Sequence, residues 1–242
     1  MATNLELTNL LSLELGTQFI NRRPTAREVF KYLDIDLLPH SGIDTLLGEI
    51  YEWNGRNWRT TGKNLIGYIF NSSEVQEVKN QLLLTPRVEA LIPDFEFTKE
   101  HILELGAKIP ALFDISFSGK MEKAKSLTIK VNKVARARIT NIDSPGIEIL
   151  QALSSFAQSK SKSYRKNVKF NYLTRSLFYA ESVEVELEKE SDVDIDLSFD
   201  LEGVEVEIKA NSDTKKHYVL KYTGQSCPFA ANFAKGKEFS DQ

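Results

Sequence analysis

The clearest pattern in the chain is a strict alternation of apolar and polar side chains between residues 177 and 201. Ten of the thirteen odd positions are apolar, whereas only Phe178 and Ala180 are apolar among the twelve even positions. A period of two predicts β-strands with one buried face and one polar face. The polar face is almost entirely acidic and carries Glu184, Glu186, Glu188, Glu190, Asp192, Asp194, Asp196 and Asp200.

A single strand over these residues would be about 80 Å long, at ~3.3 Å per residue, whereas ordinary strands have about 3 to 10 residues. We therefore expect a break near residues 188–192, although neither Gly nor Pro marks it. Further on, Glu202-Gly203 predicts a two-residue hairpin loop. That loop would pair Leu201 with Val204, Phe199 with Val206 and Leu197 with Ile208.

Two interpretations of this segment stay open. It can be an antiparallel sheet with one face in the core and one face in water. It can also be a membrane β-hairpin, which needs apolar side chains toward lipid and charged side chains toward an aqueous lumen over about 9 to 11 residues. On the second interpretation the membrane-inserting residues are Val193, Ile195, Leu197, Phe199, Leu201, Val204, Val206 and Ile208.

The same patterning predicts the other elements. Residues 5–15, 24–33 and 73–84 are expected to be helices, and residues 53–62 a loop or the tip of a hairpin. Alternation from Leu127 to Ile139 predicts a strand, a helix is expected to begin at residues 143–145, and residues 158–166 read as a Ser/Lys-rich loop. From about residue 168 to residue 222 the pattern predicts mainly β-strands. Residues 228–239 can be one more strand or a tail that packs on the domain. The prediction is a single α+β domain over residues 1–242, with a long twisted antiparallel sheet and several short helices.

Composition narrows the class of protein. The chain has 242 residues, of which 41% are hydrophobic and 27% charged, so it is not intrinsically disordered. No apolar run approaches the ~18 residues of a membrane helix. Residues 1–15 contain two acids and no base, which does not fit a signal peptide, so we expect a cytoplasmic protein. The single cysteine, Cys227, excludes an internal disulfide and a cysteine-based zinc cluster.

The net charge of −3 is the sum of separate charged blocks. Residues 181–207 hold twelve acids and one base, Lys189. Two basic blocks, the first at residues 120–138 and the second at residues 160–169, are suited to binding the headgroups of anionic lipids. A nucleic acid is the rival partner, but no recognition motif is present, and a solvated surface is the third interpretation. The candidate lipid-binding residues are Lys120, Lys123, Lys125, Lys130, Lys133, Arg136, Arg138, Lys160, Lys162, Arg165, Lys166 and Lys169.

Catalytic motifs are missing from the sequence. His40, His101 and His217 are widely spaced and match no metal-ligand pattern, and no phosphate-binding or nucleophile motif occurs. We therefore expect neither an enzyme, nor a cofactor, nor a metal site.

The second half of the chain resembles the pore-forming domain of the gasdermin family. The resemblance covers about residues 100–242 and follows the order of SGKMEKAKSLTIKVNKVARARI, SPGIEILQAL, a Lys-rich loop, YLTRSLFYAESVEVEL and HYVLKYTGQSCPFAANFAKGKEF. It implies a gasdermin-like fold that binds acidic lipids at the inner face of the cell membrane, oligomerises, and extends two hairpins into a transmembrane β-barrel that causes cell death. The second hairpin would fall on about residues 168–210.

The chain is too short for the C-terminal inhibitory domain that many gasdermins carry. Control by an inhibitory partner, by dimerisation or by expression itself is therefore expected. The oligomer would consist of copies of this chain, or would include a related chain in a mixed pore. Cys227 can contribute an intermolecular disulfide, although a small buried side chain is its ordinary role. The alternative function is a non-catalytic soluble interaction module whose charged faces dock a protein partner or a polyanion.

Overall fold

The computed structural model describes residues 23–38, 45–54, 58–83, 87–105, 108–109, 115–139, 155, 162–199, 204–222 and 228–239. These residues form antiparallel sheets and several short helices, which confirms the predicted α+β class. The chain divides into two compact units, each built from three separate stretches of sequence.

The first unit comprises Met1–Ile35, Ala90–Val134 and Ala180–Ser226. Its helices are α2 (Ala26–Leu33), α5 (Lys99–Leu105) and the 3-10 helix η1 (Met121–Lys123). Its strands are β5 (Phe95–Thr98), β6 (Lys108–Ile109), β7 (Ile115–Gly119), β8 (Ala124–Asn132), β11 (Ser182–Lys189), β12 (Ile195–Phe199), β13 (Val204–Asn211) and β14 (Lys215–Tyr222).

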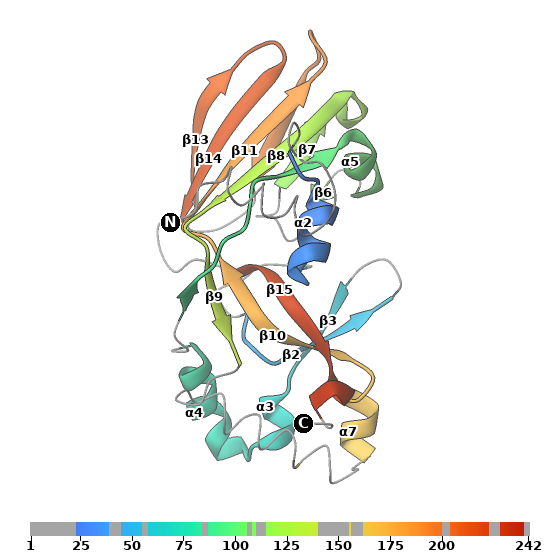
Figure 1. The fold of residues 1–242 in the computed structure, drawn as a ribbon, viewed down its shortest axis with the longest axis vertical. Coiled ribbons are helices and arrows are strands. Elements are labelled where there is room, and N and C mark those ends of the chain that lie inside the picture. The colour runs from blue at the N-terminus through green and yellow to red at the C-terminus, as the bar shows by residue number, and fades with distance from the viewer. Residues whose placement is uncertain are drawn as a thin grey trace. The chain divides into compact units, whose positions relative to one another are not determined.

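These strands form two sheets. One has the order β13-β14-β11-β8-β5, and its long strands lie side by side in Figure 1; the other has the order β12-β7-β6. One face of the five-stranded sheet forms the core, because alternate residues along β8 and β11 are buried there. The buried residues on this face include Leu127, Ile129, Val131, Val183, Val185 and Leu187.

Helix α2 confirms the helix predicted over residues 24–33. The Thr25 hydroxyl accepts a hydrogen bond from the Glu28 backbone N–H, and the Glu28 carboxylate accepts one from the Thr25 backbone N–H, so the two residues form a capping box. The helix ends at Asp34, which adopts a left-handed conformation with φ of 53°. Val29 and Phe30 lie on its buried face, and the Phe30 ring meets Phe95 of β5 edge-on at 5.1 Å.

The second unit comprises Asp36–Glu89, Ala135–Tyr179 and Cys227–Gln242. Its helices are α3 (Ile66–Ile69), α4 (Ser72–Leu83), α7 (Lys162–Asn167) and the 3-10 helix η2 (Gly236–Phe239). Its strands are β1 (Asp36–Leu37), β2 (Glu49–Trp53), β3 (Trp58–Asn64), β4 (Val88–Glu89), β9 (Ala135–Arg138), β10 (Tyr172–Tyr179) and β15 (Pro228–Lys235).

All seven strands of this unit belong to one sheet, in which β10 pairs with β15 on one side and with β2 and β9 on the other. The hairpin predicted around residues 53–62 is present as β2 and β3, and Trp53 pairs with Trp58 across it. The Trp58 ring stacks on Phe233 of β15 at 4.1 Å, and its Nε1 donates to Asp36 at 2.7 Å. The hairpin is therefore fixed to the centre of the sheet by one aromatic side chain.

Several predicted boundaries need correction. The strand expected from Leu127 to Ile139 is divided into β8 and β9, because Lys133 between them takes a φ of 50°. The expected loop at residues 158–166 contains the start of helix α7. Helix α4 confirms the helix predicted over residues 73–84, with bounds one residue earlier. The helices expected at residues 5–15 and after residue 143 lie outside the described residues.

We predict that Gly119→Ala destabilises the first unit by about 1–3 kcal/mol. Gly119 pairs with Ile195, has a φ of 84°, and a Cβ there would lie 2.2 Å from the Asp194 carbonyl oxygen. Gly67→Ala is the matched control, because nothing lies within 4 Å of its added Cβ and the helical position favours Ala. Urea denaturation of both variants tests this, and equal midpoints would contradict the close approach of β7 to β12.

Candidate functional site

The acidic face of β11 lies between β8, which contributes Lys130, and β14, which contributes Lys215, His217 and Lys221. Register pairs Glu184 with Lys130 of β8 on one side, and Glu186 with His217 of β14 on the other. The next strand outward, β13, is acidic again, and its Glu207 forms an ion pair of 3.1 Å with Lys221 of β14. Charge therefore alternates from strand to strand across the polar face of this sheet.

Glu184 is the most highly connected residue of this polar face. Its carboxylate lies 3.5 Å from Lys130 Nζ and 3.2 Å from His217 Nε2, and it accepts a hydrogen bond of 3.2 Å from Asn132. Partial burial raises the pKa of the Glu184 carboxyl, but Lys130 and Asn132 outweigh it, so this pKa lies below its ordinary value. The carboxylate is thus held ionised between β8 and β14.

The alternating segment is divided where the sequence predicts a break. Strand β11 ends at Lys189, β12 begins at Ile195, and Asp192 between them takes a φ of 59°. Asp is one of the few residues other than Gly that enter this left-handed conformation at modest cost, which explains a turn without Gly or Pro. A second division, between β10 and β11, falls at residues 180–181 and was not predicted.

The predicted hairpin pairing is wrong for the folded chain. Strand β12 pairs with β7, with Leu197 opposite Phe117, and β13 pairs with β14, with Val206 opposite Leu220. The two segments on either side of Glu202-Gly203 therefore belong to different sheets. Sequence alternation specifies the faces of a strand but not its partner, which explains the error.

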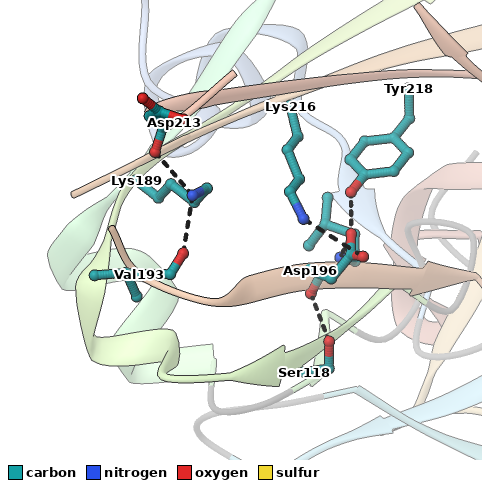
Figure 2. Close-up of polar contacts among 8 residues, drawn as sticks. Ser118, Lys189, Val193, Asp196, Asp213, Lys216 and Tyr218 are labelled. Carbon is teal, nitrogen blue, oxygen red and sulfur yellow. Dashed lines mark hydrogen bonds and ion pairs between the residues drawn. The ribbon is translucent and has the colours of Figure 1, made fainter. Parts of the chain in front are cut away.

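Lys189 is a buried basic residue at the end of β11, with only 6% of its surface exposed. Its Nζ donates to the carbonyl oxygen of Val193 and to that of Asp213, both at 2.8 Å (Figure 2). Val193 lies in the turn between β11 and β12, and Asp213 lies in the turn between β13 and β14. One ammonium group therefore joins both turns, and no described carboxylate forms an ion pair with it.

Asp196 of β12 joins the same region to β14. Its carboxylate accepts a hydrogen bond from the Tyr218 hydroxyl and lies 3.5 Å from Lys216 Nζ, while its carbonyl accepts from Ser118 of β7 at 3.3 Å (Figure 2). Burial raises the pKa of Asp196, but Tyr218, the Leu197 amide and Lys216 outweigh it and hold this pKa below its ordinary value. Burial and Asp196 together raise the pKa of Tyr218.

The predicted membrane-inserting residues divide into buried and exposed groups. Ile195 and Leu197 are buried in the folded chain, Val193, Phe199 and Val204 are half-buried, and Leu201 lies outside the described residues. Val206 and Ile208 are on the same face of the sheet as the core but are 44% and 61% exposed. The core thus leaves much of the apolar face of β13 uncovered.

Three lysines of the first basic block form ion pairs with acidic residues of the same unit. Lys123, Lys130 and Lys133 lie 3.1, 3.5 and 2.9 Å from Glu190, Glu184 and Glu181 respectively. Lys120 and Lys125 are exposed. Such half-exposed pairs contribute about 0–1 kcal/mol each, so they hold these lysines only weakly.

The second basic block surrounds helix α7. Lys162, Arg165 and Lys166 are exposed on this helix, Lys169 follows it, and Lys160 lies outside the described residues. Sequence reasoning missed Phe170, whose side chain is 72% exposed and lies 5.4 Å from the Lys169 ammonium. An exposed aromatic ring among cations is typical of protein surfaces that rest on a lipid interface. In the sequence, Phe170 could have been noticed only as an apolar residue that fits neither a strand nor a helix pattern.

Arg136 and Arg138 lie on β9, next to a third arginine that the sequence did not single out. Partial burial, Arg175 of β10 and Arg136 together lower the pKa of the Arg138 guanidinium. The buried Nε of Arg175 has no hydrogen-bond partner among the described residues. The cluster therefore concentrates positive charge that its described surroundings do not neutralise.

The remaining predicted residues can be placed only in part. Cys227, His40 and Asp200 lie outside the described residues. Within the part of the chain that the structure describes, no group of three His, Cys, Asp or Glu side chains could hold a metal ion. No described helix has the length and apolar character that a membrane crossing requires.

The fold and the site together define an α+β protein that carries an amphipathic strand segment and separate basic surfaces. No protein-family model matches the chain, and no curated protein does. Among solved structures, the chain is similar to a bacterial gasdermin from Bradyrhizobium tropiciagri, with 11% identity and a TM-score of 0.38 over 84% of this chain and 82% of that one. At this identity and TM-score the similarity assigns neither a family nor a function.

We predict that Asp196→Asn lowers stability at pH 7 by about 1 kcal/mol, at the low end for charged hydrogen bonds because the carboxylate is half exposed. The folded chain lowers the pKa of Asp196, so this contribution is present above the ordinary pKa and is lost as the pH falls below about 4. Urea denaturation at pH 7 and at lower pH measures both effects. Asp194→Asn, two residues away and exposed, is the control. A similar loss in both variants would remove the assigned role of Asp196.

Proposed function

We propose that this chain is a membrane pore-forming protein that binds acidic lipids, oligomerises and inserts amphipathic β-hairpins. Permeabilisation of the cell membrane would then cause cell death. The whole chain, residues 1–242, would act as the pore-forming domain, in the cytoplasm when inactive and at the cell membrane when active. This function is non-catalytic and needs no cofactor.

The register between β11 and β14 carries this proposal. Glu188 pairs with Lys215, and each step forward along β11 is matched by one step back along β14. If the chain continued straight in this register, Ile195 would pair with Ile208, Leu197 with Val206 and Phe199 with Val204. A hairpin of this kind closes at residues 200–203, which include Gly203. The folded chain thus already contains the base of a long hairpin.

The faces of this straightened hairpin suit a membrane-embedded barrel. Register keeps the apolar residues of β12 and β13 on one face, which would meet lipid. The opposite face would carry Asp194, Asp196, Glu205 and Glu207 toward an aqueous lumen. The exposed side chains of Val206 and Ile208 support this, because they leave the apolar face partly uncovered before any rearrangement.

The basic surfaces supply the attraction to acidic lipid. Each Lys or Arg near an anionic membrane surface contributes about 1 kcal/mol. The exposed cations of α7, with Phe170 beside them, form the strongest such surface among the described residues of the second unit. The arginine cluster of β9 and β10 adds to it. Lys120 and Lys125 serve this role in the first unit.

A membrane barrel of this kind requires self-association. The few strands of one chain would leave unpaired edges in the bilayer, and only strands from several chains can close the sheet into a barrel. The partners would be further copies of this chain or a related chain in a mixed pore. Restraint before activation would come from an inhibitory partner or from a dimer, in which Cys227 could form an intermolecular disulfide. The sequence resemblance to gasdermins motivates this part of the proposal.

We predict that the protein, alone or with a related chain, releases dye from acidic vesicles faster than from neutral ones. Ile208→Asp should slow release at least about tenfold, because a carboxylate on the lipid face must be desolvated. Since Ile208 is 61% exposed, this variant should keep its fold. Leu197→Asp should abolish release. Because Leu197 is only 6% exposed, the fold of this variant must be checked by circular dichroism.

Leu83→Asp is the matched control, since Leu83 is 45% exposed and lies on α4, which bears none of the proposed hairpin or lipid-binding residues. Equal dye release by the Ile208 and Leu83 variants would remove β13 from the inserting segment. Absence of release by the unaltered chain, tested with and without a related chain, would favour the interaction module instead.

A second prediction concerns ion selectivity. Asp194→Lys together with Glu205→Lys should leave the pore intact and shift its preference from cations toward anions, because both residues would line the lumen. Reversal potentials in planar bilayers measure the preference. Glu77→Lys with Glu238→Lys reverses two exposed acids of the second unit as a control. An unchanged reversal potential in the first double variant would show that the lumen assignment is wrong.

A further inference from the structure

Two lysines lie on the apolar face of the β11–β14 pair, where the alternation calls for apolar residues. Lys216 is opposite Leu187, and Lys189 is the next residue on the same face of β11. Both are largely covered in the folded chain, with 6% of Lys189 and 14% of the Lys216 side chain exposed. Covering two cations at the edge of a core costs free energy unless each finds acceptors.

Every acceptor recorded for these two ammonium groups lies in a segment that straightening would move. Lys189 donates to the carbonyl oxygens of Val193 and Asp213, in the two turns, and Lys216 pairs with Asp196 of β12 (Figure 2). In the straightened hairpin Asp196 would lie on the polar face, whereas Lys216 would stay opposite Leu187 on the apolar face. Both lysines would therefore lose these partners in the same rearrangement.

The same register sets where the lysines would end up. Residues 190–199 and 204–213 would form the two arms of the hairpin, ten residues each, which matches the ~9–11 residues of a membrane-crossing strand. Lys189 would directly precede the first arm in the sequence, and Lys216 would follow the end of the second arm by three residues, so both would lie at the base of the hairpin. Both ammonium groups would then project on the lipid side, at the depth of the headgroups rather than of the acyl chains.

We infer that Lys189 and Lys216 form a binding site for the phosphate groups of anionic phospholipids, a site that is hidden in the folded chain and opens when the hairpin straightens. This inference rests on the proposed pore-forming function. Headgroup phosphate oxygens replace the two carbonyls and the Asp196 carboxylate as acceptors. Because a cation is costly deeper in the bilayer, the lysine pair also fixes how far the hairpin inserts.

The test compares two double variants that differ in whether positions 189 and 216 carry a positive charge. Lys189→Arg with Lys216→Arg keeps two cations that can reach phosphate, whereas Lys189→Met with Lys216→Met keeps similar length without charge. Hydrogen exchange should accelerate in residues 190–194 and 211–215 of the methionine variant, which has no donor for the Val193 and Asp213 carbonyls, relative to the unaltered chain. Lys63→Met, an exposed lysine on β3, is the control for loss of a positive charge.

Dye release is then measured from phosphatidylserine-containing vesicles and from phosphatidylcholine vesicles. The arginine variant should release dye from the acidic vesicles like the unaltered chain, and the methionine variant at least about tenfold more slowly. Equal release by the two double variants would overturn the lysine site while leaving the pore proposal intact. No release by the unaltered chain, with or without a related chain, would overturn both.

Circular dichroism checks that the methionine variant folds. If it does not, the single variants Lys216→Met and Lys216→Arg replace the doubles, since among the described residues Lys216 pairs with Asp196 alone and the Asp196 side chain is half exposed. The expected difference between them has the same sign, and its absence again overturns the site.

Discussion

Strand β11 is hydrogen-bonded on both sides, to β8 and to β14, and this double pairing constrains the first unit. Every residue of β11 is thereby committed to one of two faces, and a slip of one residue would exchange them. Such a slip would bury Glu184 and Glu186 and expose Val183 and Val185. The ion pairs on the polar face are individually weak, but they favour the observed register, in which Glu184 meets Lys130 of β8 and Glu186 meets Lys215 of β14.

Local periodicity is the reason that much of this unit could be predicted. The faces of β8 and β11, the break near residues 188–192, and helices α2 and α4 all follow from patterns within about ten residues of sequence. The partner of β12 could not be predicted in this way, because pairing with β7 joins residues about 80 positions apart. Nothing local identified residues 115–119 as a strand. The left-handed Asp192 was equally hard to foresee, since Asp permits that conformation without requiring it.

The candidate site shows the same division between local and distant information. Basic blocks are visible in sequence, but the acids that engage Lys123, Lys130 and Lys133 come from 48 or more positions away and appear only in the fold. Lys189 was visible as the one base in an acidic stretch, yet its role depends on two turns that sequence reasoning did not bring together. Arg175 and Phe170 gave almost no sequence signal, and the structure alone draws attention to them.

The uncovered apolar face of β13 has a consequence for how the chain behaves before it meets any membrane. Among the described strands β13 pairs only with β14, so it is a sheet edge, and an edge that bears exposed Val206 and Ile208 is a template for unwanted aggregation. Glu205, Glu207 and Lys209 alternate with the apolar residues along the strand, and charged side chains on an edge strand disfavour edge-to-edge pairing because they must stay hydrated. The acidic residues of β13 would thus keep neighbouring copies apart in solution, and high salt, which screens them, should shorten the time that concentrated protein stays monomeric.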